Sequence, residues 1–433
     1  MEKCILNNEK YYKGVIILGM LLSVLWVFLV DTKPFSDFNY YYKLAGNIAN
    51  GKSWGSTYTS VGYCIILGAI FKIFGISLLN AKIFNLFLTL GNYILFYNIL
   101  KRVNLKERDR KIIFTLFVLI PSNIFYNSIL ATEPLFTNIL IYITFVYFSD
   151  MKCKYVYLGI LVGLNTMIKP YFIIYFFVIF LLELLINKNI LNSIKNSLLI
   201  LLICAITISP FIYRNTKLMG QFTYVSNNGG IVLYINNNSQ NKTGRWMAAK
   251  DVENSIVKTE EYKLANQTVK NKMLNKAAKE WIKSHPIQFI KLGFKRLFNV
   301  YFLADDVFYG FYGTQVSDNN KINVFIRVTI IKNIIFIPAI IFILIYSIVV
   351  LKHIWRGETH LLNKYTLYNV ILFYMFTSVY FITEGQGRYS FPQIFTMIYC
   401  FCGFINFVVK KKSTKEYFIR DGVPFLKSEK IKR

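Results

Sequence analysis

The chain has 433 residues and a formal net charge of +28, and 55% of its residues are hydrophobic. Its apolar residues come in long runs, and a transmembrane helix needs about 20 mostly apolar residues, so the sequence predicts an all-α polytopic protein of the cell membrane. The basic residues cluster in short segments between these runs, as the positive-inside rule describes. This distribution argues against a nucleic-acid partner.

The first apolar run, residues 15–30, follows a basic start and is predicted to be a retained first span that carries the chain outward. Just beyond it, residues 38–49 have helical spacing, with Tyr41 on the apolar face, which predicts a short amphipathic helix along the membrane surface. Ser36 and Asp37 stand at its start, where either side chain can cap free backbone N–H groups and the helix dipole favours a carboxylate. A plain N-cap aspartate and a functional carboxylate both fit this position.

The next apolar segment, 61–76, is short and contains a lysine. A full crossing there would place the basic cluster 101–111 outside, so we predict a second interfacial or re-entrant helix within a first outer loop of residues 32–80. The later spans then alternate to give about 10–12 in all, with both termini cytoplasmic. Those predicted after the first are 81–100, 112–126, 131–148, 155–168, 171–186, 198–213, 322–351, 365–383 and 391–409.

Four regions follow from this alternation: an N-terminal membrane domain 1–213, an extracytoplasmic region 214–322, C-terminal membrane helices 323–409 and a basic cytoplasmic tail 410–433. The extracytoplasmic region opens with a loop rich in glycine and asparagine. Residues 251–285 are rich in lysine and glutamate with one apolar stripe, which predicts a helix in a small cap. The following segment, 287–303, is amphipathic and suits the outer interface.

Charged and polar residues gather where the predicted spans meet their outer loops. A charged side chain at membrane depth costs about 2.5–3.5 kcal/mol on insertion scales, so these positions need a reason. We predict one polar cavity open to the outer leaflet, with carboxylates for acid–base chemistry and cations for a phosphate, which the planar arginine fork suits. The residues are Asp37, Glu133, Lys169, Arg214, Glu384 and Arg388.

Each candidate has a structural alternative. Arg214 and Arg388 are placed where an interfacial arginine snorkels to the headgroups. Lys169 joins two spans and reaches the same headgroups, and Glu133 suits the first turn of a helix in ATEPLF. The outer tyrosines fit an aromatic belt as well as a platform for a sugar.

The sequence indicates no metal site and no cofactor. Its six cysteines are scattered without a C-x-x-C pair, and it has only three histidines. Asp305 and Asp306 are expected to be solvated loop acids, with a paired-carboxylate metal site as the alternative. A divalent ion is therefore left open but not indicated.

The ordered series SDFNYYYKLAGNIANG, SVGYCIILGAIFKIFG, ATEPLF, GLNTMIKP, YRNTKLMGQFTYVSNNGGIVLYINNNSQNKTG and GRYSFP resembles the bacterial branch of the GT-C glycosyltransferases. These polytopic enzymes are related to protein O-mannosyltransferases and to the aminoarabinose transferases of lipid A. Each motif alone is weak, but together they cover nearly the whole chain. The resemblance implies a GT-C-like bundle that transfers a sugar from a polyprenyl-phosphate carrier to a protein, lipid or envelope polymer on the extracytoplasmic face.

The family pattern also assigns roles to residues of this chain. An acid at the start of the first outer loop activates the acceptor, and Asp37 holds that position. Phe38 follows it where many relatives carry a second acid, so Glu133 is chosen as the partner carboxylate. Val61 stands where relatives commonly have proline, and the histidine and glutamate metal site of some aminoarabinose transferases has no clear counterpart.

The remaining assignments concern binding. The residues predicted to bind the donor phosphate are Arg214, Arg388 and Lys169. Those predicted to bind substrate come from the amphipathic helix, the RN-then-glycine-loop segment and the RY-x-x-P segment: Tyr41, Asn215, Asn228, Tyr234, Asn237 and Tyr389.

Three other functions remain in contention. A transporter or flippase of lipid-linked sugars needs polar residues that continue to both membrane faces, and often has internal repeats. The sequence shows no repeat, and its polar candidates lie near one predicted face. A polysaccharide polymerase or ligase shares the outer-face chemistry and differs in the size of its donor. A non-enzymatic scaffold would not explain why the acid of the first outer loop and the outer arginines occur on the same predicted side.

Overall fold

The computed structural model describes residues 2–103 and 105–409, which form helices and no strand. The first half of the chain contains α1 Glu2–Leu29, α2 Ser36–Ala49, α3 Gly62–Phe74, α4 Leu78–Arg102, α5 Glu107–Leu119, α6 Pro121–Phe125, η1 Tyr126–Ser128, α7 Glu133–Tyr147, α8 Lys154–Thr166, η2 Pro170–Ile174, α9 Tyr175–Asn187 and α10 Ile190–Met219. The second half contains α11 Gly229–Asn236, η3 Ala249–Asp251, η4 Ile256–Lys258, α12 Glu260–Leu264, α13 Gln267–Ser284, α14 Pro286–Phe302, α15 Val307–Gly310, α16 Asp318–Trp355, η5 Thr359–Leu361, α17 Lys364–Ile382, η6 Gly387–Gln393 and α18 Ile394–Val409.

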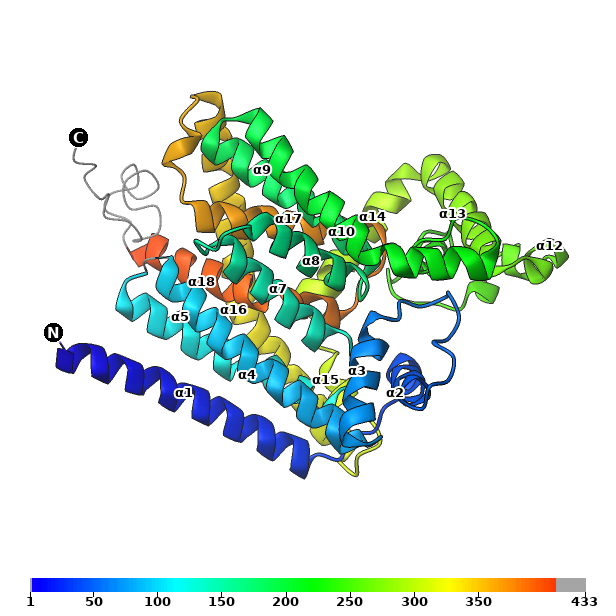
Figure 1. Cartoon of the computed structure of the whole chain (residues 1–433), viewed down its shortest axis with the longest axis horizontal. Helices are drawn as coiled ribbons and strands as arrows, with labels where there is room; N and C mark the ends of the chain where they lie inside the picture. The colour runs from blue at the N-terminus through cyan, green and yellow to red at the C-terminus, as the bar shows by residue number, and fades with distance from the viewer. Residues whose placement is uncertain (1, 104, 410–433) are drawn as a thin grey trace.

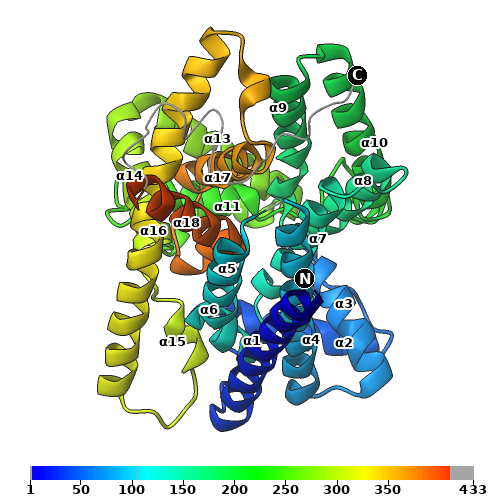
Figure 2. The same cartoon turned by 90° about the vertical axis from the view of Figure 1, so that its left-hand side faces the viewer.

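The long helices form a bundle with distinct ends (Figure 1). The start of α1 and the end of α18 lie at one end, while α2, α3 and the helices α12 and α13 lie at the other. Figure 2 views the molecule from the terminal end, with α16 along one edge and α2 and α3 along the other. The predicted tail 410–433 lies outside the described residues.

The described residues contain seven helices long and apolar enough to cross a membrane, and α5 with α6 and η1 makes an eighth if this pair, bent by 47°, is one span. The prediction of an all-α polytopic membrane protein is confirmed. The estimate of about 10–12 spans is higher than this count, because the predicted spans 131–148 and 155–168 are the helices α7 and α8, of 15 and 13 residues. Apolar composition does not fix helix length, and α8 ends where the chain enters the turn before Pro170.

Helix α2 begins at Ser36, as its amphipathic spacing indicates, and packs against α3. The predicted capping by Ser36 or Asp37 is wrong, because the N-cap residue is Phe35 and makes no side-chain cap hydrogen bond. Asp37 instead lies within the first turn, where the helix dipole still favours a negative charge. The position of its carboxylate is therefore set by α2 itself.

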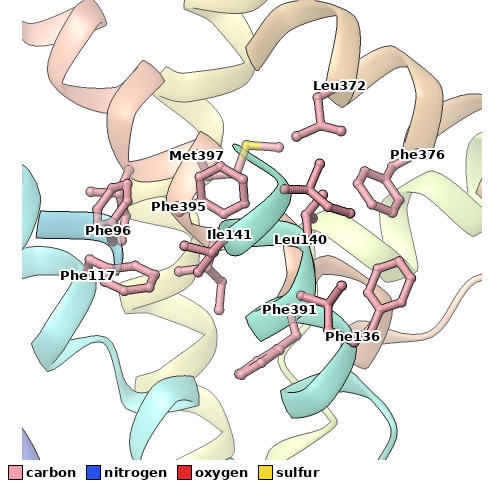
Figure 3. Packing of buried hydrophobic residues seen from close by; sticks show 14 of the residues in the cluster. Phe96, Phe117, Phe136, Leu140, Ile141, Leu372, Phe376, Phe391, Phe395 and Met397 are labelled. Carbon is pink, nitrogen blue, oxygen red and sulfur yellow. The ribbon is translucent and has the colours of Figure 1, made fainter. Parts of the chain in front are cut away.

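Helix α7 lies in the centre of the apolar core, with side chains from α17 and α18 around it (Figure 3). Phe136 and Leu140 of α7, Phe376 of α17 and Phe395 of α18 are fully buried. Protein interiors are packed as densely as organic crystals, so such a helix has little freedom to move. Glu133, its first residue, is thereby held at a fixed place in the bundle.

Residues 214–302 contain a small core of their own, in which α11 packs against α13 around Tyr234, Leu274 and Ala278. The prediction of one helix over 251–285 is wrong for its first part, which forms the turns η3 and η4 and the short α12. Asn254 adopts a left-handed backbone conformation at φ 49°, and the side chain of Asn266 caps α13 by accepting from the N–H of Val269. These two asparagines separate the segments. We call residues 214–302 the cap region.

Helix α14 is amphipathic, as expected for 287–303, and packs against α17 and α16. Proline at its first position leaves no N–H to satisfy, which suits a helix start. The outward face carries exposed Ile287, Ile290, Phe294 and Phe298. Such a stripe is typical of a helix at the boundary between lipid and water.

Candidate active site

Charged side chains from four separate elements meet at the start of α2. These elements are the first turn of α2, the start of α7, the turn after α8, and η6. The residues are Asp37, Glu133, Lys169 and Arg388, which we call the charge cluster. Arg388 Nη2 lies 3.9 Å from Asp37 Oδ2, and Arg388 Nε lies 4.0 Å from Glu133 Oε1. Lys169 Nζ donates to Glu133 Oε1 at 3.0 Å. The predicted convergence of Asp37 with Arg388 is present in the structure.

The Arg388 guanidinium is close to two carboxylates without being hydrogen-bonded tightly to either. Separations of 3.9 and 4.0 Å exceed hydrogen-bond distance. Its Nε is buried and has no hydrogen-bond partner among the described residues. The group is held instead by the rings of Phe38, Tyr309 and Tyr389, whose centroids lie 5.7, 6.0 and 5.3 Å from Cζ. Arg388 therefore has one buried N–H, at Nε, that no acceptor among the described residues engages.

The two carboxylates of the charge cluster differ in access. The side chain of Glu133 is 1% exposed, whereas that of Asp37 is 60% exposed. A buried carboxylate needs cations and hydrogen bonds to offset desolvation, and Glu133 has Lys169 on one oxygen and the hydroxyl of Thr132 at 3.3 Å from the other. Of the two, only the Asp37 carboxylate is accessible from solvent, while the Glu133 carboxylate is buried beside the two cations.

Tyr41 lies one turn after Asp37 on α2, and its ring meets that of Tyr63 edge to face at 5.7 Å. Burial, followed by the nearby carboxylate of Asp37, raises the pKa of the Tyr41 phenol well above its ordinary value. The phenol therefore stays protonated, so beside the charge cluster it is a hydrogen-bond donor and not a base.

Two glycines allow the backbone to bring these residues together. A Cβ at Gly62, the first residue of α3, would lie 2.6 Å from the carbonyl oxygen of Met167, and the Gly62 N–H donates to that oxygen at 3.2 Å. This contact holds the turn that carries Lys169. A Cβ at Gly387 would lie 2.4 Å from Asp305 Oδ1, so only glycine lets the segment before Arg388 approach so closely.

Tyr389 and Glu384 fix the segment around Arg388. The hydroxyl of Tyr389 donates to Glu384 Oε2 at 2.7 Å, and Gln386 donates to the other carboxylate oxygen at 2.5 Å. The Tyr389 ring stacks on Tyr380 of α17 at 5.5 Å and lies 5.5 Å from Lys169 Nζ. Tyr389 thus borders the charge cluster, while its hydroxyl is already engaged.

The structure gives Arg214 and Asn215 other partners. Arg214 donates to the carbonyl oxygen of Gly55 at 2.6 Å and to Asn215 Oδ1 at 2.8 Å. Asn215 in turn donates to the carbonyl oxygens of Tyr224 and Val225. Arg214 therefore anchors the loop between α2 and α3 and is not part of the charge cluster.

The three other predicted binding residues lie in the cap region and have partners there. Asn228 precedes α11 and accepts a hydrogen bond from Ser226, and the hydroxyl of Tyr234 donates to Ser255 Oγ at 3.3 Å. Asn237 donates to the carbonyl oxygen of Ile382 at 3.0 Å, which ties the cap region to the end of α17. Their contacts connect elements of the fold and do not reach the charge cluster.

Two residues near the site, Arg296 and Asp306, are buried in a way that the sequence did not predict. Arg296 of α14 is fully buried and donates to Asn237 Oδ1 at 2.8 Å and to the carbonyl oxygens of Phe381, Ile382 and Asn236. It joins the ends of α11 and α17 just before the segment that carries Arg388. Its spacing on an amphipathic helix gave no sign of this, because a snorkelling arginine has the same pattern.

Asp306 also behaves differently from expectation. It was expected to be a solvated loop acid, but it is 4% exposed and accepts a hydrogen bond from Tyr126 at 2.8 Å. Burial raises the pKa of this carboxyl to about 6. Its neighbour Asp305 pairs with Arg245 of the cap region. Within the described residues, no group of three or more histidine, cysteine, aspartate or glutamate side chains is placed to hold a metal ion.

The sequence matches no protein-family profile and no curated protein. Among solved structures it matches the archaeal oligosaccharyltransferase AglB from Archaeoglobus fulgidus, in complex with an inhibitory peptide and a dolichol-phosphate. That alignment has a TM-score of 0.51 at 12% identity and covers 95% of this chain and 52% of that chain. The fold resembles the GT-C type. A second structure of the Archaeoglobus fulgidus oligosaccharyltransferase, tethered to an acceptor peptide containing the NVT sequon, gives the same score and identity and covers 95% and 50%.

The chain thus spans about half the length of the oligosaccharyltransferase that it resembles. At 12% identity the likeness concerns the fold alone. It bears out the GT-C architecture expected from the sequence. It does not extend to the narrower resemblance to protein O-mannosyltransferases and aminoarabinose transferases, which rests on the sequence motifs.

Proposed function

We propose that this chain is an integral membrane glycosyltransferase that moves a hexosyl or pentosyl group from a polyprenyl-phosphate carrier to an acceptor on the extracytoplasmic face. The observation that carries the proposal is the charge cluster, in which an exposed carboxylate lies 3.9 Å from a guanidinium whose Nε–H has no hydrogen-bond partner among the described residues. Transfer from a lipid phosphate needs both parts, a base for the acceptor and a cation for the departing phosphate.

Asp37 is the general base of the proposed reaction. Its carboxylate takes the proton of the acceptor nucleophile as that atom attacks the anomeric carbon, so a bond to the acceptor forms while the bond from carbon to the phosphate oxygen breaks. The carrier phosphate leaves with the bonding electron pair, and the configuration at the anomeric carbon is inverted. Asp37 can do this because its side chain is exposed and lies in the first turn of α2, where the helix dipole favours a negative charge.

Arg388 and Lys169 bind the donor phosphate in this proposal. The guanidinium provides a planar pair of donors and the ammonium provides a point charge, and both lie in a partly dry site where such bonds are stronger. Glu133 orients these two cations, and Tyr41 is available as a neutral donor to the sugar or acceptor. The assignment of Glu133 thus moves from partner base to positioning residue.

The test is transfer of labelled sugar from a polyprenyl-phosphate donor by the purified protein in lipid vesicles. Asp37→Asn is expected to abolish sugar transfer. It should leave insertion of the protein into the membrane and its elution in size-exclusion chromatography unchanged. Asp31→Asn is the matched control, because Asp31 is an exposed acid in the same outer segment and pairs only with Lys33 among the described residues. Full transfer by Asp37→Asn would reject the assignment, whereas movement of intact lipid-linked sugar across the vesicle without transfer would favour a flippase.

A further inference from the structure

Helix α13 of the cap region carries a row of lysines that the proposed chemistry does not use. Its 18 residues contain five lysines and one glutamate, a net charge of +4. Lys272, Lys276, Lys279 and Lys283 are spaced by four, three and four residues, so they share one face of the helix. We call these four residues the lysine stripe.

The lysine stripe lies opposite the face by which α13 packs. Leu274 and Ala278 are buried against α11, and at about 100° per residue the stripe falls roughly 140–200° away from Leu274. All four lysines are exposed. They line one shallow open concavity together with Asn275 and Glu280. The charges therefore face solvent on the outside of the cap region.

Few anionic partners within the chain neutralise this surface. No salt bridge among the described residues involves a lysine of the stripe, and Lys272 donates only to the side-chain oxygen of Gln221, at 2.8 Å. Elsewhere on the surface lysines do find acids, as Lys263 does with Glu260 three residues away. The four like charges repel one another. Binding of an anionic ligand relieves this repulsion, so it is more favourable here than on a surface of mixed charge.

We propose that the lysine stripe binds a soluble or wall-attached polymer bearing repeated anionic groups, and that this polymer is the acceptor of the transferase. This inference rests on the function proposed above. The Cβ atoms of neighbouring lysines on the stripe lie about 5–6 Å apart. This repeated spacing suits a run of phosphates or carboxylates better than one isolated anion. A polymer that contacts all four spans about 16 Å of helix.

The pattern of exposed apolar residues favours a polymer over a lipid surface. A helix that lies on a membrane combines its lysines with an exposed apolar face that enters the bilayer. Within α13, Gln267–Ser284, no large apolar side chain is exposed, because the apolar face is used against α11. Helix α14 has the opposite character, with its exposed stripe of isoleucine and phenylalanine. In Figure 1, α13 lies beyond the end of the bundle that carries α2 and α3.

The cap region is also joined to the segment that carries the proposed base. Asn227 donates to Thr268 of α13 at 3.1 Å and to Thr57 at 2.9 Å, and its backbone N–H donates to the carbonyl oxygen of Thr57 at 2.8 Å. Thr57 belongs to the loop that follows α2, the helix of Asp37. A polymer held on α13 is therefore attached to an element in direct contact with the first outer loop.

The experiment measures binding of fluorescent long-chain polyphosphate to the full-length protein in detergent, at several salt concentrations. The test variant is K272Q/K276Q/K279Q/K283Q. The matched control, K242Q/K250Q/K258Q/K263Q, removes the same charge from the rest of the cap region. We expect the test variant to bind at least tenfold more weakly and the control less than twofold. The slope of log K against log salt should fall by about 3 in the test variant, since each phosphate contact contributes about 0.7–0.9.

Three outcomes would overturn the inference. These are equal weakening in both variants, competition by orthophosphate as effective as by polyphosphate, and preferential binding of vesicles of anionic lipid over polyphosphate. Asp37→Asn must bind polyphosphate as the wild type does, because the measurement does not involve transfer. If the transferase proposal fails and the polyphosphate result holds, the lysine stripe is still an anion-binding surface but its ligand is not an acceptor.

Discussion

Replacing Arg388 by lysine tests how the donor phosphate is held. Arg388 lies 4.0 Å from the buried Glu133 carboxylate, a pair that interacts by about 4 kcal/mol at an effective dielectric constant of 20, so removing the charge would disturb the whole cluster. Lysine keeps the charge and loses the two-pronged donor. One hydrogen bond to a charged group contributes about 1.5–3 kcal/mol, so the donor KM should rise about 10- to 150-fold.

The assay is transfer in vesicles, with the donor and the acceptor varied separately. Arg388→Lys should raise the donor KM and leave the acceptor KM within about twofold. Arg327→Lys on the exposed side of α16 is the matched control and should change neither value. An unchanged donor KM for Arg388→Lys, or an equal rise in the acceptor KM, would refute the reasoning.

Three further predictions concern stability. Lys169→Met should lower the unfolding free energy by about 3–5 kcal/mol, because the buried Glu133 then has only the more distant Arg388 as a cation. The double variant Lys169→Met/Glu133→Gln should recover most of the loss, measured as melting temperature. Arg296→Met should lower it by at least about 3 kcal/mol by leaving buried carbonyl oxygens without donors, a prediction that fails if the melting temperature is unchanged. The Asp306 carboxyl has a pKa near 6 in the fold against an ordinary 3.8, so the folded state binds the proton more tightly and stability should fall as pH rises from about 4 to 6. Asp306→Asn should remove that slope, and an equal slope in both proteins would contradict the burial argument.

Much of the helical order was predictable because apolar periodicity and the lysine clusters depend on local sequence. The segments 38–49, 61–76 and 287–303 are the helices α2, α3 and α14 within a few residues. The break within 251–285 was missed because it depends on two asparagines, one with a left-handed backbone and one that caps. Single residues of this kind do not interrupt the apolar pattern.

The sequence could predict which charged residues lie at the same end of the bundle, because the alternation of spans assigns each span end to one side of the membrane. Alternation of spans placed Asp37 and Arg388 at one end of the bundle, although the chain separates them by more than 300 residues. The roles of Arg214 and Arg296 were not predictable, because both donate to backbone carbonyl oxygens whose positions only the folded chain defines. An arginine at a span end has the same sequence pattern whether it binds phosphate or closes a loop.

The central claim is that this chain adds a sugar to an extracytoplasmic acceptor and that Asp37 is required. The most direct measurement is mass spectrometry of surface lipids, wall polymers and secreted proteins from cells that lack the gene, complemented with the wild type or with Asp37→Asn. The account predicts that one species loses a hexose or pentose in the deletion strain and regains it only with the wild type. An unchanged profile in the deletion strain, or full restoration by Asp37→Asn, would contradict it.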